Sequence, residues 1–264
     1  MEARRLGRTD IEISPIGLGC MQFAGTANYT RLIINPIGQE TATSVVRAAL
    51  DGGVTWFDTA EMYGRGQSEQ ALAAALDECG IAPGQVTVAT KWTPHLRTAA
   101  SITRTIGERL ARLRGHPVGL HQIHMPMGSL SSIPAQLKAM AQLVRSGRIR
   151  AVGVSNFSAR QMVLAHRALA RSAPPARRLF SRNVLSAQGL ARTRPLIEAM
   201  RRIGDGHGAT ISQVALNWLI TRYGDTVVAI PGASKPRQAA EAAGAMGFAL
   251  TDAERGTLDE LSLT

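Results

Sequence analysis

The chain has 264 residues, 45% of them hydrophobic, so it can bury a large core and is unlike a disordered protein. It contains no apolar run of about 18 residues, so we expect no transmembrane helix. Its first residues lack the apolar segment of a secretory signal, so we expect no such signal. Cys20 and Cys79 lie far apart, in no metal-binding spacing. These properties predict a cytoplasmic protein, built as one barrel or as two small domains.

The net charge of +11 raises the hypothesis that the protein binds nucleic acid. Of the 30 basic residues 27 are arginine, and they are scattered, with no basic run of five. Aromatic residues, which would stack on bases, are not interleaved with them. We therefore expect solvated helix faces rather than a nucleic-acid surface.

The N-terminal part predicts a hairpin and then a first strand. Residues 3–14 predict the hairpin, with its turn at 7–10, and residues 16–21 predict the strand. A helix is expected at about 41–51, where four apolar residues recur at helical spacing. Apolar Val54, Trp56 and Phe57 then predict a buried strand that ends at Asp58, with Tyr63 in the loop beyond it.

Strands and helices then alternate at a steady period. We expect helices at about 68–79, 101–113 and 133–146, strands at 85–91, 118–124 and 148–156, and a further helix opened by the capping box Ser158–Gln161. The strands end in the polar residues Asp58, Lys91, His124 and Ser155. These residues follow one another at intervals of 33, 33 and 31. This pattern predicts stacked βα units with a parallel sheet. In a (β/α)8 barrel the C-terminal ends of the strands form the active-site face, so there the four side chains would converge.

The C-terminal part resumes the pattern, but the middle is too short. Helices are predicted after the capping residue Thr210, from Ser234 to Ala245 and after Thr251, with a strand at 225–230. Between Ser155 and Ile230 there are 75 residues, 24 fewer than three repeats of 33 would need. We therefore predict that residues 172–194 form an irregular or mobile connection in place of a sixth strand, sixth helix and seventh strand. The next helix is predicted to begin near Pro195.

Asp58, Tyr63, Lys91 and His124 together suit the reduction of a carbonyl group. The carbonyl oxygen needs a proton, and a tyrosine has a pKa of about 10, which a neighbouring ammonium would lower. Asp58 would hold Lys91 charged, and His124 would donate to the carbonyl oxygen. The alternative is that Asp58 caps a helix, Tyr63 is an ordinary loop residue, Lys91 reaches solvent and His124 is a core histidine.

Six segments carry a resemblance to the aldo-keto reductase superfamily: GLGCM, FDTAEMYG, ATK, LHQIH, GRIRAVGVSNF and AIPGASKPRQAAEA. The resemblance extends over residues 4–168 and 210–261. The resemblance implies a single (β/α)8 barrel domain over residues 1–264 that reduces aldehydes or ketones with NADPH and without a metal. It also implies that Tyr63 is the proton donor of a tetrad with Asp58, Lys91 and His124.

The same resemblance implies where the cofactor binds. Ser155 and Asn156 would hold the nicotinamide carboxamide, and the backbone of Cys20 and Met21 would lie near the ribose. The whole set of cofactor-binding residues is then Cys20, Met21, Asp58, Ser155, Asn156, Gly232, Ala233, Ser234, Lys235, Gln238 and Glu241. Cationic Lys235 and Arg237 at a helix start favour the 2′-phosphate of NADPH over NADH.

The sequence departs from the family in the cofactor site. The family's strand-six glutamine and strand-seven aromatic have no match, and its late arginine and asparagine appear here as Gln238 and Ala242. An alternative function is therefore an NADPH-binding regulatory or weakly active barrel. The partner implied is a small carbonyl compound, with no membrane or nucleic acid; the oligomeric state stays open, a homo-oligomer through the irregular barrel edge included. Four residues are candidates for a mostly apolar substrate pocket, with the alternative that some of them belong to the core: Phe23, Trp92, Met125 and Met127.

Overall fold

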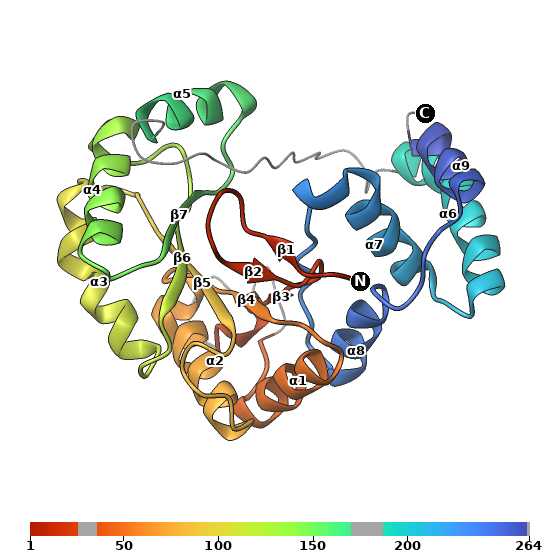
Figure 1. The fold of residues 1–264 in the computed structure, drawn as a ribbon, viewed down its shortest axis with the longest axis horizontal. Coiled ribbons are helices and arrows are strands. Elements are labelled where there is room, and N and C mark those ends of the chain that lie inside the picture. Colours follow the sequence, from red (N-terminus) through yellow and green to blue (C-terminus); the bar gives the residue numbers. More distant parts are fainter. Residues whose placement is uncertain (26–35, 170–186, 263–264) are drawn as a thin grey trace.

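The protein, described here from a computed structural model, is built around a parallel β-sheet (Figure 1). The structure describes residues 1–25, 36–169 and 187–262. The five strands pair in chain order, each parallel to the next: β3 (Leu18–Gly19), β4 (Trp56–Asp58), β5 (Thr87–Trp92), β6 (Val118–Ile123) and β7 (Ala151–Val154). Four of the five lie within the predicted strands, and β5 extends one residue beyond its predicted end, to Trp92. Trp56 and Phe57 of β4 point to opposite faces of the sheet and are both buried, as is typical of parallel sheets.

A further segment lies on the open side of β3. Ile16 bridges Ala229 and Gly19 bridges Gly232, both in parallel. Residues 229–232 thus take the place that the eighth strand of a closed barrel would have. The predicted strand at 225–230 is wrong in its first half, because the 3-10 helix η4 (Gly224–Thr226) occupies it.

The helices form an outer layer around the sheet (Figure 1). Five of them follow the strands: α1 (Gln39–Asp51), α2 (Gln67–Glu78), α3 (Ala100–Arg112), α4 (Ile133–Arg145) and α5 (Ala159–Leu169). Each packs against the next, and α8 (Pro236–Gly244) packs against α1 on the other side, with α7 (Ile211–Arg222) beyond it. None of the described helices is long and apolar enough to cross a membrane.

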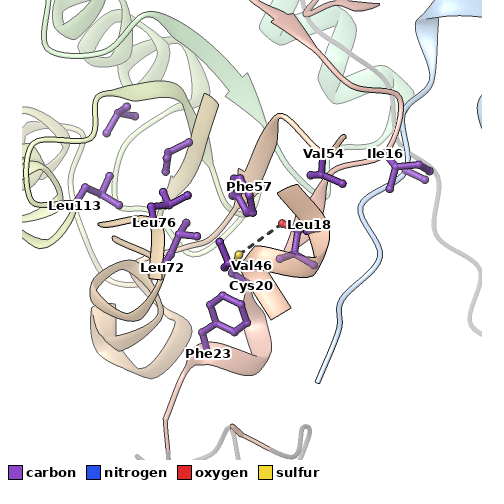
Figure 2. Packing of buried hydrophobic residues seen from close by; sticks show 14 of the residues in the cluster. Ile16, Leu18, Cys20, Phe23, Val46, Val54, Phe57, Leu72, Leu76 and Leu113 are labelled. Atoms are coloured by element: carbon purple, nitrogen blue, oxygen red, sulfur yellow. Dashed lines mark hydrogen bonds between the residues drawn. The ribbon is translucent and has the colours of Figure 1, made fainter. Parts of the chain in front are cut away.

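The main core fills the space between the sheet and these helices (Figure 2). Phe57 of β4 packs among Val46 of α1 and Leu72 and Leu76 of α2. Val46 and Leu76 lie on the faces that the 3.6-residue period predicts to be apolar. A second, smaller cluster joins α6 (Ala187–His207), α7 and α9 (Asp252–Ser262) through Met200, Val214 and Leu258.

The N-terminal hairpin covers one end of the sheet. It pairs β1 (Arg4–Arg5) with β2 (Glu12–Ile13), as predicted. Ile13 packs with Trp56 and Ala151, the first residues of β4 and β7, and the Trp56 indole donates to the Ser14 carbonyl at 3.0 Å. The hairpin therefore covers the amino ends of the strands, and their carboxyl ends remain for a functional site.

The short middle of the chain is described only in part. Residues 187–194 belong to α6, so their prediction as an irregular connection is wrong, and the helix begins at Ala187 rather than near Pro195. Proline is a helix-start signal, but Pro195 lies inside α6. The helix continues past it although proline has no backbone N–H to donate to the preceding turn. The rest of the predicted connection, up to residue 186, lies outside the described residues.

Candidate active site

The loop that carries Tyr63 is fixed by a close backbone contact. Tyr63 begins the 3-10 turn η3 (Tyr63–Gly66), and its amide donates to Ala60 at 3.0 Å. Gly64 follows with a φ of +61°, and a Cβ atom there would lie 1.9 Å from the Ala24 carbonyl oxygen. Only glycine fits this position, so the loop packs directly against the turn η1 (Met21–Phe23).

Lys91 lies at the centre of the predicted tetrad. Only 4% of the residue is exposed. Its ammonium donates to the Asp58 carboxylate, to the Thr59 carbonyl at 2.8 Å and to the Tyr63 hydroxyl at 3.5 Å. The three protons of the ammonium thus have three acceptors, and Asp58 and Tyr63 raise the pKa of Lys91 against the lowering effect of burial. Lys91 is a buried cation and does not reach solvent.

Gln122 also belongs to this cluster, although the sequence analysis did not single it out. Its amide donates to the second oxygen of Asp58 at 3.0 Å. Gln122 lies opposite Lys91 in the register of β5 and β6 and two residues before His124. Side chains two apart in a strand point to the same face, so the spacing to His124 was the signal that could have found it.

His124 completes the cluster from the end of β6. Its ring lies edge-on to the Tyr63 ring, with 5.7 Å between centroids and 81° between planes. Burial, and then the charge of Lys91, lowers the pKa of His124 to about 4. The ring is therefore neutral at physiological pH and carries one N–H donor. The structure brings all four predicted residues together.

The pKa of Tyr63 corrects one expectation. Burial raises it above the usual value of a tyrosine, and Asp58 adds to this effect. Lys91 lowers the pKa through its charge and its hydrogen bond, as predicted, but burial outweighs it. The predicted net lowering of the pKa of Tyr63 is therefore wrong.

Ser155 and Asn156 follow β7 beside His124. Asn156 adopts a left-handed conformation with a φ of +61°, and its amide nitrogen donates to the His124 carbonyl at 2.9 Å and to the Ser155 hydroxyl at 3.2 Å. Both amide hydrogens are thus engaged, which leaves the amide oxygen as an acceptor and the Ser155 hydroxyl as a donor. One donor and one acceptor fit a carboxamide such as that of nicotinamide, which carries both an acceptor oxygen and a donor NH₂ group.

The first half of the expected cofactor site lies along the same edge. The amide of Cys20 donates to the Asp58 carbonyl at 2.8 Å, and Met21 opens η1 directly after it. Gly232 lies beside Gly19, and Ala233 after it is buried. Backbone from two ends of the chain therefore meets next to the tetrad.

The second half of that site lies at the start of α8. The Gln238 amide oxygen accepts from the backbone amides of Ser234 at 2.9 Å and Lys235 at 3.1 Å. Lys235 and Arg237 are exposed. Glu241 instead accepts from the Thr210 hydroxyl at 2.7 Å, so its carboxylate is engaged at the start of α7. Among the described residues there is no cluster that could hold a metal ion.

The four candidates for an apolar pocket differ in their burial. Phe23 and Trp92 are buried in the core, so they do not line an open pocket. Met125 is half-buried, and Met127 is 71% exposed.

Comparisons with known proteins show to which family the chain is similar. A model of the aldo/keto reductase family matches residues 15–177 and 167–263. The chain is 38% identical to aldo-keto reductase YhdN of Bacillus subtilis over 61% of its length, and it spans only about half (49%) of that relative. An uncharacterized oxidoreductase of Mycobacterium bovis is 32% identical over 86% of the chain and 82% of its own length.

Solved structures give the same fold. The thermostable aldo-keto reductase Tm1743, crystallised with the inhibitor epalrestat, matches with a TM-score of 0.79 and 29% identity over 99% of this chain and 100% of its own. An aldo-keto reductase of Klebsiella pneumoniae in complex with NADPH matches with a TM-score of 0.72 and 25% identity over 98% and 95%. The chain thus has an α/β fold of the (β/α)8 barrel type and belongs to the aldo-keto reductase family.

Proposed function

We propose that this protein reduces aldehydes or ketones to alcohols with NADPH. One observation carries the proposal: a half-buried tyrosine hydroxyl lies 3.5 Å from a buried ammonium and beside a neutral histidine ring, at the carboxyl end of a parallel sheet. This is the end at which barrel enzymes place their active sites. The family membership supports the same oxidoreductase activity.

Each residue of the tetrad has a role that follows from its contacts. NADPH, when bound, supplies the hydride. Tyr63 donates a proton to the carbonyl oxygen, and Lys91 stabilises the phenolate that remains, because its charge and hydrogen bond favour that form. Asp58 holds Lys91 in place, and Gln122 in turn holds the Asp58 carboxylate. The single N–H of neutral His124 orients the carbonyl oxygen.

The cofactor proposal rests on the donor set beside the tetrad. Ser155 and Asn156 present one donor and one acceptor, which matches a nicotinamide carboxamide. The NADPH held by the Klebsiella relative supports the same nucleotide. Lys235 and Arg237 provide cations at the helix start, where an adenosine phosphate would bind.

The described cysteines are unpaired, which suits a cytoplasmic enzyme.

One observation favours the alternative of a weakly active, NADPH-binding barrel. Gln238 satisfies the backbone amides of Ser234 and Lys235 with its own side chain, so an anion would have to compete with it. The departures from the family's cofactor residues point the same way.

Fluorescence titration with NADPH, followed by turnover on a panel of aldehydes and ketones, distinguishes the two functions. The reductase function predicts saturable binding and oxidation of NADPH that depends on the carbonyl compound. Binding without turnover on any compound would favour the alternative, and no binding of NADPH would contradict both.

A further inference from the structure

Glu61 lies in the loop between Asp58 and Tyr63 but has no role in the proposed chemistry. It is 9% exposed, and its carboxylate accepts from the Thr93 amide at 2.6 Å, from Arg97 at 2.5 Å and from Arg109 in a shorter contact. Its own amide donates to the Lys91 carbonyl at 3.3 Å. Glu61 is therefore attached through its backbone to Lys91 itself and through its side chain to Thr93, which directly follows β5.

Arg109 extends these contacts into a network under the site. This arginine of α3 is 3% exposed and forms a second ion pair, at 3.5 Å, with Glu69 of α2, which is fully buried. The other oxygen of Glu69 accepts from the Thr90 hydroxyl at 2.6 Å, one residue before Lys91. The network thus starts and ends on β5 and joins it to the Tyr63 loop, α2 and α3.

Such a network is costly to bury, so packing alone gives no reason for it. A buried ion pair loses hydration, and an apolar pair of similar volume is often no less stable. Its geometric effect is specific, however. The Tyr63 loop contacts β5 through Glu61, and the Tyr63 amide donates back to Ala60 within the same turn. A shift of Glu61 would therefore move the Tyr63 hydroxyl relative to Lys91.

We propose that Glu61 and Arg109 are positioning residues, which set the separation between the Tyr63 hydroxyl and the Lys91 ammonium by tying the Tyr63 loop to β5 and α3. They touch neither substrate nor cofactor in this account. The inference rests on the proposed function, because it assigns a purpose to that separation in carbonyl reduction.

The test compares Glu61→Gln with Glu108→Gln. Both changes remove a carboxylate partner of Arg109, but the Glu108 side chain is 55% exposed and accepts, at 2.9 Å, from the terminal nitrogen of Arg109 that does not contact Glu61. Each variant is compared with the wild type in thermal melting, NADPH binding, kcat, KM and the pH dependence of kcat. The ionisation of Tyr63 is also read directly, as the difference in phenolate absorbance between each protein and its Tyr63→Phe counterpart.

We expect Glu61→Gln to lower kcat by about tenfold to a hundredfold, the effect of a small misplacement of a catalytic group, with NADPH affinity unchanged. The pKa of Tyr63 should rise further as Lys91 becomes more distant. The other groups that face Tyr63, namely Asp58, His124 and Cys20, are left in place by the substitution. Glu108→Gln should behave as the wild type in every measurement.

An unchanged Tyr63 titration and an unchanged kcat in a folded Glu61→Gln protein would overturn the proposal, as would equal effects in both variants. If Glu61→Gln does not fold, Arg97→Gln decides, since it removes one donor to Glu61 near the surface and should shift the Tyr63 titration in the same direction. The absorbance titration needs no turnover. An inactive wild type would therefore count against the proposed function alone.

Discussion

At the scale of single residues, Lys91 carries a charge in a place where water does not solvate it. Asp58, Thr59 and Tyr63 provide all its acceptors. We predict that Lys91→Met lowers turnover at least about a hundredfold, because the phenolate loses its stabilising charge. NADPH affinity, measured by fluorescence titration, should change little. Turnover near the wild-type rate would show that the ammonium is not needed.

The residues of the site could be predicted from the sequence where spacing determines them. Asp58, Lys91 and His124 end successive strands, so parallel pairing brings them to one edge. The net pKa shift of Tyr63 could not be predicted, because it depends on how deeply the whole fold buries the hydroxyl. Gln122 was missed because an amide inside a strand looks like any polar core residue.

At the scale of elements, the start of α8 should decide the choice of nucleotide. Lys235 and Arg237 are exposed cations beside the segment that pairs with β3. We predict that NADPH binds at least about tenfold more tightly than NADH, a difference of roughly 1.4 kcal/mol. Replacing both cations by glutamine should remove most of this preference in direct titrations. Equal affinity of the wild-type protein for the two nucleotides would count against the assignment.

Element boundaries were predictable where capping residues and period agree. Thr210 and Gln213 form the expected capping box at α7, and the Ser158 box opens α5. The strand at 225–230 was placed too early, because a short apolar run does not show that its first residues form a 3-10 turn. The start of α6 lies earlier than predicted, because Pro195 lies inside the helix and is not its first residue.

At the scale of the whole molecule, two buried histidines should make stability depend on pH. Burial lowers the pKa of His121 to about 3 and that of His124 to about 4. Below a pH of about 6.5 the unfolded chain binds protons at these positions and the folded chain does not, so stability falls as the pH falls.

We predict a decline in the free energy of unfolding from about pH 6.5 towards pH 4, with a slope of up to about 1.4 kcal/mol per pH unit for each histidine. Denaturant unfolding at a series of pH values measures it. His121→Asn should flatten the slope, and the same change at exposed His95 should leave it as it is. A slope that is identical in all three proteins would contradict this account.

The overall architecture was predictable because one unit repeats. Strand-end polar residues at intervals of 33, 33 and 31 predict a parallel sheet with outer helices, and the structure has both. The period fails after Ser155, where the chain is too short for the remaining units. Sequence period gives no information on how a shortened barrel closes, because closure depends on pairing between segments far apart in the chain.

The central claim is that Tyr63 gives the proton in carbonyl reduction, and a single-turnover measurement on Tyr63→Phe tests it most directly. Enzyme with NADPH bound is mixed with an aldehyde that the wild type reduces, and loss of NADPH absorbance is followed. Phenylalanine keeps the ring beside His124 but removes the hydroxyl that Lys91 contacts. We predict unchanged NADPH binding and loss of at least about a hundredfold in the rate of hydride transfer. A rate close to that of the wild type would contradict the account.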